Sequence, residues 1–352
     1  MRVALDATPL VLPTGGLARY TAELAGALAE NYPQDGFVLL SDQRFRMPEP
    51  PQRNLCRGGP PSNVLERRWW LWGVQRAMTR LGCDLFHGTN FEVPYAPLRP
   101  SVITVHDLSP WMNPEWHHAA GRVRRRAPRL LGMGLATMVI TPTEAVRAQV
   151  VERFRLAGSR AVAVPHAASP VFRPVEAETA APYFLYVGAL EPRKNLYALM
   201  EAWRIVRRRY SVDLVLAGRR RADFAELEPE PGLCLPGEVT DAELARLYSG
   251  ALAFVYPSHY EGFGLPVLEA MQCGACVFIS RDRALREVAG DAGLSLDGEG
   301  AWVEAMCAAT GNPEWLQERR QASLARARDF SWARTARLTH DVYEEATRRF
   351  GY

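Results

Sequence analysis

Short apolar runs of strand-forming residues alternate with longer segments of helical period along the first half of the chain. The apolar runs predict strands at 2–6, 37–41, 84–87, 101–105, 137–141 and 161–165. Helical periodicity predicts helices at 16–31, 63–81, 121–134 and 143–155. Such alternation is typical of a doubly wound α/β domain with a parallel sheet.

The same alternation begins again after an irregular stretch. Residues 166–182 are rich in Pro and Ala and lack a clear period, which predicts a linker between domains. Beyond it, strands are predicted at 183–187, 213–217, 252–256 and 275–279. Helices are predicted at 195–209, 240–249, 264–273, 301–310, 313–328 and 332–349. We therefore expect two Rossmann-like domains with a cleft between them, and ligands at the carboxyl ends of the strands.

Composition narrows the class of protein. With 352 residues, 48% hydrophobic and 23% charged, the chain fits two globular domains and not a disordered or fibrous protein. Its longest apolar run, 130–140, is shorter than the roughly 18–20 residues that cross a bilayer. The first residues are too short an apolar segment for a signal peptide, and the six Cys are scattered. We expect a reduced, cytoplasmic protein.

Charge is distributed unevenly along the chain. Residues 1–170 hold 20 Lys/Arg against 13 Asp/Glu, and residues 171–352 hold 22 against 26, so the halves carry +7 and −4. The densest basic run is Arg122–Arg129, beside the apolar Leu130, Leu131 and Met133. At helical spacing, this basic run predicts either a face that contacts an anionic membrane or an ordinary solvated surface. No recognition motif accompanies it, so we expect no nucleic acid partner.

A glycine-rich segment follows the predicted strand 252–256. Residues 261–269 read EGFGLPVLE, with carboxylates at both ends, Glu261 and Glu269. Gly262 and Gly264 allow a ligand to approach the backbone, and free N–H groups at a helix start form an anion site. The carboxylates could reach the sugar hydroxyls and the ribose of a nucleotide-sugar. The alternative is a loop with glycines and a surface pair of glutamates.

A second segment, GALEPRKN at 188–195, leads from the predicted strand 183–187 into a helix. Arg193 and Lys194 are adjacent there, and Lys194 is the single lysine among 42 basic residues. Two cations at a helix start oppose the helix dipole, which favours an anion such as a diphosphate beside them. The alternative is an exposed basic pair.

Weaker candidates lie in the first half. Gly15-Gly16 forms a turn before the predicted helix 16–31, where backbone could approach a phosphate. His106 ends the predicted strand 101–105, and His87 and Asn90 end another, so they are expected near a ligand or in the core. Metal chemistry is not expected, because there is no Asp-x-Asp and Cys273-x-x-Cys276 lacks further ligands.

With these motifs the chain resembles the retaining, nucleotide-sugar-dependent GT-B glycosyltransferases called glycosyl transferases group 1. The resemblance extends over almost the whole sequence, from Gly15-Gly16 through TVHDLSPW, TPTEAV, VPHAASPVFRP, GALEPRKNL, LPGEVTDAELARLY and EGFGLPVLEAMQCGACVF to EVAGDAGL. It implies an acceptor-binding domain at 1–170, with 331–352 packing back on it, and a donor-binding domain at 171–330.

The resemblance also implies roles for individual residues. Catalytic roles fall to His106 and Glu261. The donor diphosphate would contact Gly15, Gly16, Arg193 and Lys194. The sugar and ribose would contact Phe263, Gly264, Leu265 and Glu269. The base would border Gly218, Gly237, Glu238 and Val239.

The implied reaction moves a hexose from a UDP-sugar or GDP-sugar to a glycan, lipid-linked glycan or lipid, with retention and without a metal cofactor. We expect front-face attack, because no second carboxylate lies at the spacing of a glycosidase pair. The sequence departs from the family pattern after strand 275–279, where four charged residues crowd the loop: Arg281, Asp282, Arg283 and Arg286. The identity of the donor's base and sugar therefore stays open. Alternatives are a nucleotide-sugar epimerase or hydrolase of this shape and a non-catalytic binding protein. The missing GxGxxG fingerprint disfavours an NAD-dependent oxidoreductase.

Overall fold

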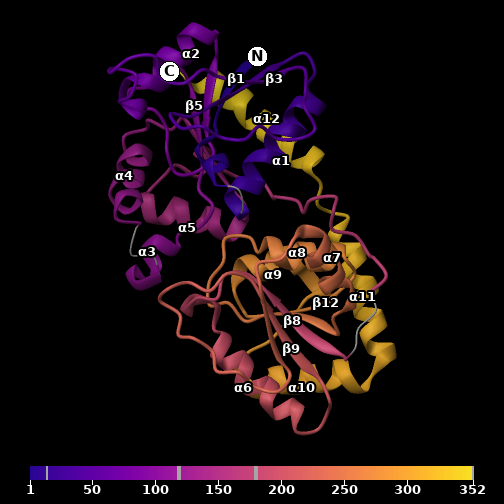
Figure 1. Cartoon of the computed structure of the whole chain (residues 1–352). Helices are drawn as coiled ribbons and strands as arrows, with labels where there is room; N and C mark the ends of the chain where they lie inside the picture. The colour runs from indigo at the N-terminus through magenta and orange to yellow at the C-terminus, as the bar shows by residue number, and fades with distance from the viewer. Residues whose placement is uncertain (13–14, 117–119, 178–180, 351–352) are drawn as a thin grey trace. The chain divides into compact units, whose positions relative to one another are not determined.

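A computed structural model describes residues 1–12, 15–116, 120–177 and 181–350 (Figure 1). The chain divides into unit 1, Met1–His166 with Ser331–Tyr352, and unit 2, Ala167–Phe330. The sequence predicted the boundary after residue 170, and the structure has it four residues earlier, after His166.

Unit 1 contains a seven-stranded parallel sheet in the order β3-β2-β1-β4-β5-β6-β7. Its strands are β1 Arg2–Asp6, β2 Gly36–Leu40, β3 Leu55–Arg57, β4 Leu85–Gly88, β5 Ser101–Thr104, β6 Met138–Thr141 and β7 Ala161–Ala163. The central strands are buried along their length, as expected when helices cover both faces of a parallel sheet. Six of these strands were predicted; the three-residue edge strand β3 was not.

The helices of unit 1 follow the predicted segments with two differences: a four-residue helix at Ser109–Met112 was not predicted, and one predicted helix begins later than expected. These helices are α1 Gly16–Asn31, α2 Val74–Leu81, α3 Ser109–Met112, α4 Gly121–Gly132, α5 Glu144–Phe154 and α12 Trp332–Arg349. The predicted helix 63–81 is wrong in its first half, because regular α-helix begins only at Val74, after the π-helical turn Trp69–Gly73. Short 3-10 turns lie at Thr8–Val11, Pro114–Trp116 and Gly158–Arg160.

The last helix returns to the N-terminal unit, as predicted. α12 packs against α1, β5 and β6 (Figure 1). Ser331 caps its first turn by accepting a hydrogen bond from the amide of Arg334. The Thr335 hydroxyl donates to the carbonyl of Pro165 at 2.7 Å. The C-terminal helix therefore packs on the N-terminal unit, as the resemblance to GT-B proteins implied.

Unit 2 contains a six-stranded parallel sheet in the order β10-β9-β8-β11-β12-β13. Its strands are β8 Tyr183–Val187, β9 Asp213–Ala217, β10 Leu233–Gly237, β11 Ala253–Tyr256, β12 Cys276–Ile279 and β13 Leu294–Ser295. Its helices are α6 Leu196–Arg207, α7 Asp241–Gly250, α8 Leu265–Gln272, α9 Arg283–Ala289, α10 Gly298–Gly311 and α11 Pro313–Ala327. The short 3-10 turns Pro192–Lys194 and Gly290–Ala292 complete it. Edge strands β10 and β13 and helix α9 were not predicted.

The predicted linker 166–182 is partly fixed on unit 2. Phe172 is fully buried in the core of that unit. The side-chain amide of Gln272 donates to the carbonyls of Ser169 and Phe172, at 2.9 and 2.6 Å. The first part of this segment is therefore a packed element of unit 2; its residues 178–180 lie outside the described residues.

Candidate functional site

The candidate site of unit 2 lies where strands β8, β9, β11 and β12 end. After β8 the chain forms a 3-10 turn over Pro192–Lys194, and Asn195 takes the left-handed conformation (φ 56°) that redirects it into α6. Arg193 and Lys194 thus end a short turn and do not begin the helix, which corrects the sequence argument from the helix dipole.

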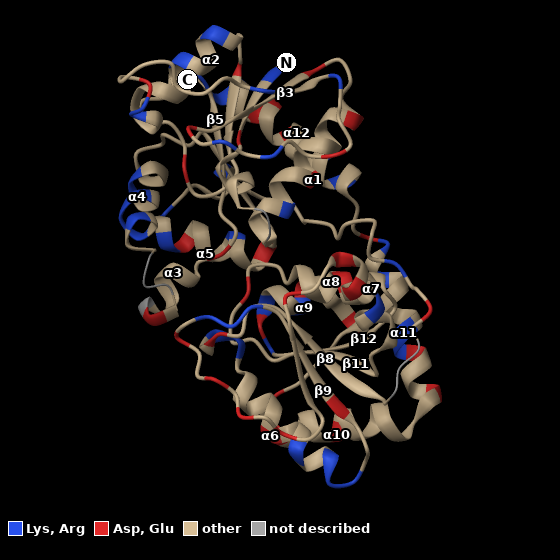
Figure 2. Ribbon diagram, in the orientation of Figure 1, with Lys and Arg blue, Asp and Glu red and all other residues tan. Residues whose placement is uncertain are grey.

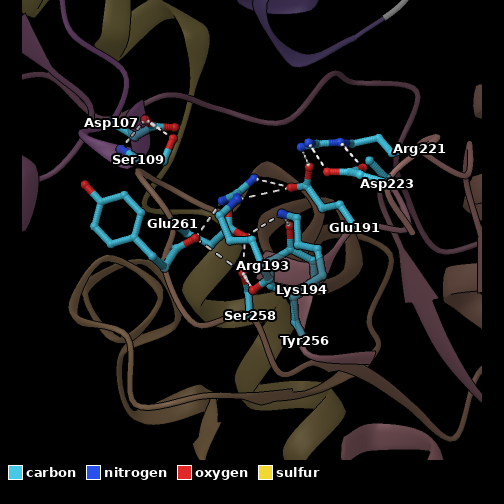
Figure 3. A network of polar contacts seen from close by, with 12 residues as sticks. Asp107, Ser109, Glu191, Arg193, Lys194, Arg221, Asp223, Tyr256, Ser258 and Glu261 are labelled. Atoms are coloured by element: carbon cyan, nitrogen blue, oxygen red, sulfur yellow. Dashed lines mark hydrogen bonds and ion pairs between the residues drawn. The ribbon is translucent and has the colours of Figure 1, made fainter. Parts of the chain in front are cut away.

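Lys194 and Glu261 form a buried ion pair (Figure 3). The Lys194 Nζ donates to Glu261 Oε1 at 2.5 Å and to the Tyr256 hydroxyl at 2.7 Å. Nζ also lies 4.8 Å from the centre of the Tyr256 ring, a cation–π contact. The Ser258 hydroxyl donates to the same Oε1 at 2.5 Å. Both charged side chains are nearly inaccessible, with exposed fractions of 5% for Lys194 and 8% for Glu261.

Arg193 lies between two carboxylates. Its Nε and Nη2 donate to Glu191 Oε1 at 3.1 and 2.7 Å. Its Nη1 donates to the carbonyl of Tyr260 at 2.6 Å and lies 3.3 Å from Glu261 Oε2. Glu191 in turn pairs with Arg221, so the sequence-predicted cations are already matched by acids of the same unit.

Electrostatics keep Glu261 ionised. Burial by itself would raise the pKa of this carboxyl, but the charges of Lys194 and Arg193 outweigh burial and lower the pKa from 4.5 to about 2. Burial lowers the pKa of Lys194, and the Glu261 carboxylate counters that lowering. We treat the pair as ionised, because the carboxylate has Lys194, Arg193 and Ser258 as partners. The pKa of nearby Asp282 is raised to about 6, chiefly by burial.

The glycine-rich segment forms the predicted strand–loop–helix. Gly264 has φ 89°, and a Cβ there would lie 2.5 Å from Leu285 Cδ2, so only glycine fits. Leu265 opens α8; Pro266 has no N–H, and the amides of Val267 and Leu268 donate to the Gly264 carbonyl at 2.9 and 3.3 Å. Phe263 is buried with its ring 6.0 Å from that of Phe330.

Glu269 lies inside α8, away from solvent. It is buried, and its Oε2 accepts a hydrogen bond from the Tyr248 hydroxyl at 3.1 Å. The sequence predicted a ribose contact here; the structure gives the carboxylate a structural partner from α7.

The residues predicted to border the base lie around two loops. The amide of Gly218 donates to the Gly237 carbonyl at 2.8 Å. A Cβ on Gly218 would lie 2.1 Å from the Gly188 carbonyl oxygen, so the loops after β8 and β9 meet through glycine backbone. Glu238 is exposed, and Val239 packs against the core of unit 2.

The predicted residues of unit 1 lie at one glycine turn and one strand end. Gly15, with φ 118°, precedes α1, and both it and Gly16 are exposed. His106 follows β5, and its Nε2–H donates to the Thr89 carbonyl at 2.7 Å. Burial lowers the pKa of His106, which favours the neutral ring with Nδ1 unprotonated.

His87 belongs to the core of unit 1. It is fully buried, its Nδ1 lies 2.7 Å from the Tyr343 hydroxyl, and its Nε2 lies 2.8 Å from Thr104 Oγ1. Burial lowers its pKa to about 3, so the ring is neutral. The functional alternative for His87 is therefore wrong: the ring links α12 to the sheet. Asn90, its companion at this strand end, is half-buried.

The basic run lies on α4 (Figure 2). Leu130 and Leu131 are buried in the core, at 3% and 0% exposure. The prediction that these two leucines share an exposed face with the arginines is therefore wrong. Met133 is 72% exposed. Arg122, Arg125 and Arg129 are exposed, whereas Arg126 contacts Glu92 and the Tyr95 ring. In the described residues, every helix is too short or too polar to span a bilayer.

Metal-binding side chains do not gather in the described part of the chain: no group of three or more His, Cys, Asp or Glu there could hold an ion. Cys273 and Cys276 are buried thiols among apolar neighbours.

Several residues of the unit 2 network had no role assigned from the sequence. They include Glu191, Arg221, Asp223, Tyr256 and Ser258. Tyr256 ends β11 and Ser258 follows it, so the rule that ligands gather at carboxyl ends of parallel strands could have found both. Glu191 and Arg221 are 30 residues apart, and no motif in the sequence indicated that they pair.

Two families of known proteins match successive parts of the chain. The family described as "Glycosyltransferase Family 4" matches residues 14–172, and "Glycosyl transferases group 1" matches residues 170–312. O-antigen chain mannosyltransferase B of Escherichia coli is 30% identical over 98% of this chain and 100% of that protein.

Solved structures share the fold. Sucrose-phosphate synthase from Thermosynechococcus elongatus superposes with a TM-score of 0.75, 20% identity and 98% coverage of both chains. Anabaena HepE in complex with UDP-glucose gives a TM-score of 0.71, 16% identity, and coverage of 98% of this chain and 100% of that one. The two Rossmann-like units, the returning C-terminal helix and the near-complete match to a relative agree: the chain belongs to the glycosyl transferases group 1, glycosyltransferases of GT-B fold.

Proposed function

We propose that this protein transfers a mannosyl group from a nucleoside-diphosphate sugar to a hydroxyl of a growing glycan, with retention of anomeric configuration. The name of the E. coli relative, an O-antigen chain mannosyltransferase, supports the sugar and the acceptor class. The observation that carries the proposal is the buried contact of Lys194 with Glu261 at the strand ends of unit 2.

Lys194 and Arg193 would bind the diphosphate and stabilise it as it leaves. Within the described residues, Nζ donates to Glu261 and Tyr256, and an ammonium has three donors. The third N–H can therefore bind a phosphate oxygen. Negative charge grows on the diphosphate as the glycosidic bond breaks, so fixed cations stabilise the transition state more than the bound donor.

Glu261 would orient the sugar as a permanent carboxylate. Its low pKa makes it a hydrogen-bond acceptor for sugar hydroxyls and not an acid. Lys194 and Ser258 contact Oε1 and Arg193 contacts Oε2, which makes the carboxylate a poor nucleophile. We therefore favour attack by the acceptor hydroxyl on the face that the diphosphate leaves, with a departing phosphate oxygen taking the acceptor proton.

For unit 1 we propose acceptor binding, with neutral His106 as a hydrogen-bonding residue. Metal independence is part of the same proposal: Arg193 and Lys194 would supply the positive charge that a divalent ion supplies elsewhere. Peripheral contact of Arg122, Arg125 and Arg129 with an anionic membrane also remains a proposal.

The test offers GDP-mannose, UDP-glucose and UDP-galactose to the purified chain and follows binding by thermal shift, since a ligand specific for the native state raises its stability. Transfer is then measured with a mannose-terminated acceptor, with and without EDTA, and NMR gives the anomeric configuration of the product. We expect one donor to be preferred, an α-mannoside from an α-linked donor, and unchanged rates in EDTA.

The outcomes separate the alternatives. Donor turnover without any acceptor would indicate an epimerase or hydrolase, and donor binding without turnover would indicate a binding protein. Glu261→Gln keeps the shape of the side chain but removes its charge, and it should abolish transfer if the carboxylate orients the sugar.

A further inference from the structure

Arg221 is not one of the two cations predicted to bind the diphosphate, Arg193 and Lys194, but it belongs to the same network of ion pairs. Its segment follows β9 and runs beside the segment that follows β8. The Leu190 amide donates to the Arg219 carbonyl at 3.0 Å, and the Arg221 amide donates to the Leu190 carbonyl at 3.1 Å. Gly188 and Gly218 allow this approach, as described above. The backbone at Arg221 is therefore in fixed register with the backbone beside Glu191.

The guanidinium of Arg221 is held on one side by Asp223. Its Nε donates to Asp223 Oδ1 at 2.9 Å and its Nη2 to Oδ2 at 2.5 Å. This two-point contact fixes the plane of the guanidinium and directs Nη1 to Glu191 Oε2 (Figure 3).

Glu191 connects the two arginines. One oxygen, Oε2, accepts from Arg221, and the other, Oε1, accepts from Arg193. Glu191 is buried, so its carboxylate needs these charged partners. Because Arg221 shares the charge of Glu191, Arg193 keeps more of its positive charge for an incoming anion while its Nε and Nη2 stay oriented.

We propose that Arg221 is a positioning residue for the diphosphate: through Glu191 it fixes the orientation and effective charge of Arg193. The inference rests on the proposed function, because it assumes that Arg193 binds the donor diphosphate. Arg221 itself contacts Glu191 and Asp223 and is given no direct contact with the donor.

The experiment measures binding of GDP and GMP, and in parallel UDP and UMP, by calorimetry. The variants are Arg221→Gln, Arg193→Gln and the double variant. Arg221→Gln should weaken diphosphate binding about tenfold, the scale of one charged hydrogen bond. It should change monophosphate binding less than about twofold. In the Arg193→Gln background it should have no further effect, since the residue that it positions is gone.

Controls keep a general loss of structure apart from positioning. Arg204→Gln removes another arginine of unit 2 that is held by two carboxylates, Glu230 at 2.8 Å and Glu201 at 2.6 Å, and it should leave both affinities unchanged. Asp223→Asn frees the guanidinium without touching Glu191 and should give an intermediate, diphosphate-specific loss.

An equal loss for diphosphate and monophosphate overturns the inference, and so does the same tenfold loss in the Arg193→Gln background. Tight diphosphate binding that Arg221→Gln leaves unchanged refutes the positioning role alone. A wild-type chain with no preference for a diphosphate over a monophosphate refutes the proposed function and this inference with it.

Discussion

Replacement of Lys194 by Met tests the buried network most directly. Methionine approximates the length of the lysine stem but removes the ammonium, which donates to Glu261 and Tyr256. The carboxylate of Glu261 then stays buried with Arg193 and Ser258 as its remaining partners.

The expected loss follows from the burial of both groups. Removing one partner of a buried ion pair costs about 3–5 kcal/mol, because the other charge is left uncompensated. We expect the lower end, about 3 kcal/mol of unfolding free energy, because Arg193 still faces Glu261. Transfer should fall at least roughly 100-fold, the scale of losing one preorganised charge contact.

Hydrogen exchange of peptides from β8 and β11 reports the opening of unit 2 by itself. The same measurement on Glu261→Gln and on Lys194→Met/Glu261→Gln completes a double-mutant cycle. Because the neutral pair no longer buries a lone charge, the double variant should lose less than the sum of the single losses, by about 1–3 kcal/mol. Arg204→Met is the control: its ion pairs are partly exposed, so its loss should stay below about 1 kcal/mol.

If the two single losses add in the double variant, Lys194 and Glu261 do not stabilise unit 2 as a pair. If Lys194→Met transfers sugar within tenfold of the wild-type rate, the ammonium does not stabilise the leaving diphosphate.

Three further predictions concern other parts of the chain. Neutral His87 stabilises the fold at pH values above its unfolded pKa of 6.5, and this stability is lost as pH falls toward its folded pKa of about 3. The difference in unfolding free energy between wild type and His87→Gln should thus shrink by about 1.2 kcal/mol from pH 6 to pH 5, and a constant difference in urea titrations would contradict this. Gly218→Ala should lower the melting temperature by several degrees, because its Cβ would meet the Gly188 carbonyl, whereas Gly26→Ala in α1 meets open space and should not; equal melting curves would disprove the close approach. Replacing Arg122, Arg125 and Arg129 by Gln should reduce sedimentation with anionic phosphatidylglycerol vesicles while sparing transfer to a water-soluble acceptor, and unchanged sedimentation would reject the membrane contact.

The local motifs could be predicted because their signal is local. Gly264 needs φ 89°, a strand precedes it and α8 follows, and all three features are visible in one segment of sequence. The central strands were found for a similar reason: strands buried on both faces are apolar throughout. Edge strands carry no such signal, and the three central residues of β10 are exposed.

Sequence patterns were enough to locate the two series of strands and helices, the glycine turns, and Arg193, Lys194 and Glu261 at strand ends. The partners of these side chains depend on how the chain folds. Lys194 meets Glu261 across 67 residues, and Leu130 and Leu131 turn inward while the arginines beside them stay outside. A parallel sheet brings the ends of distant strands to one edge, and burial there requires every charge to have a partner. The spacing of neighbouring residues in the sequence contains neither condition.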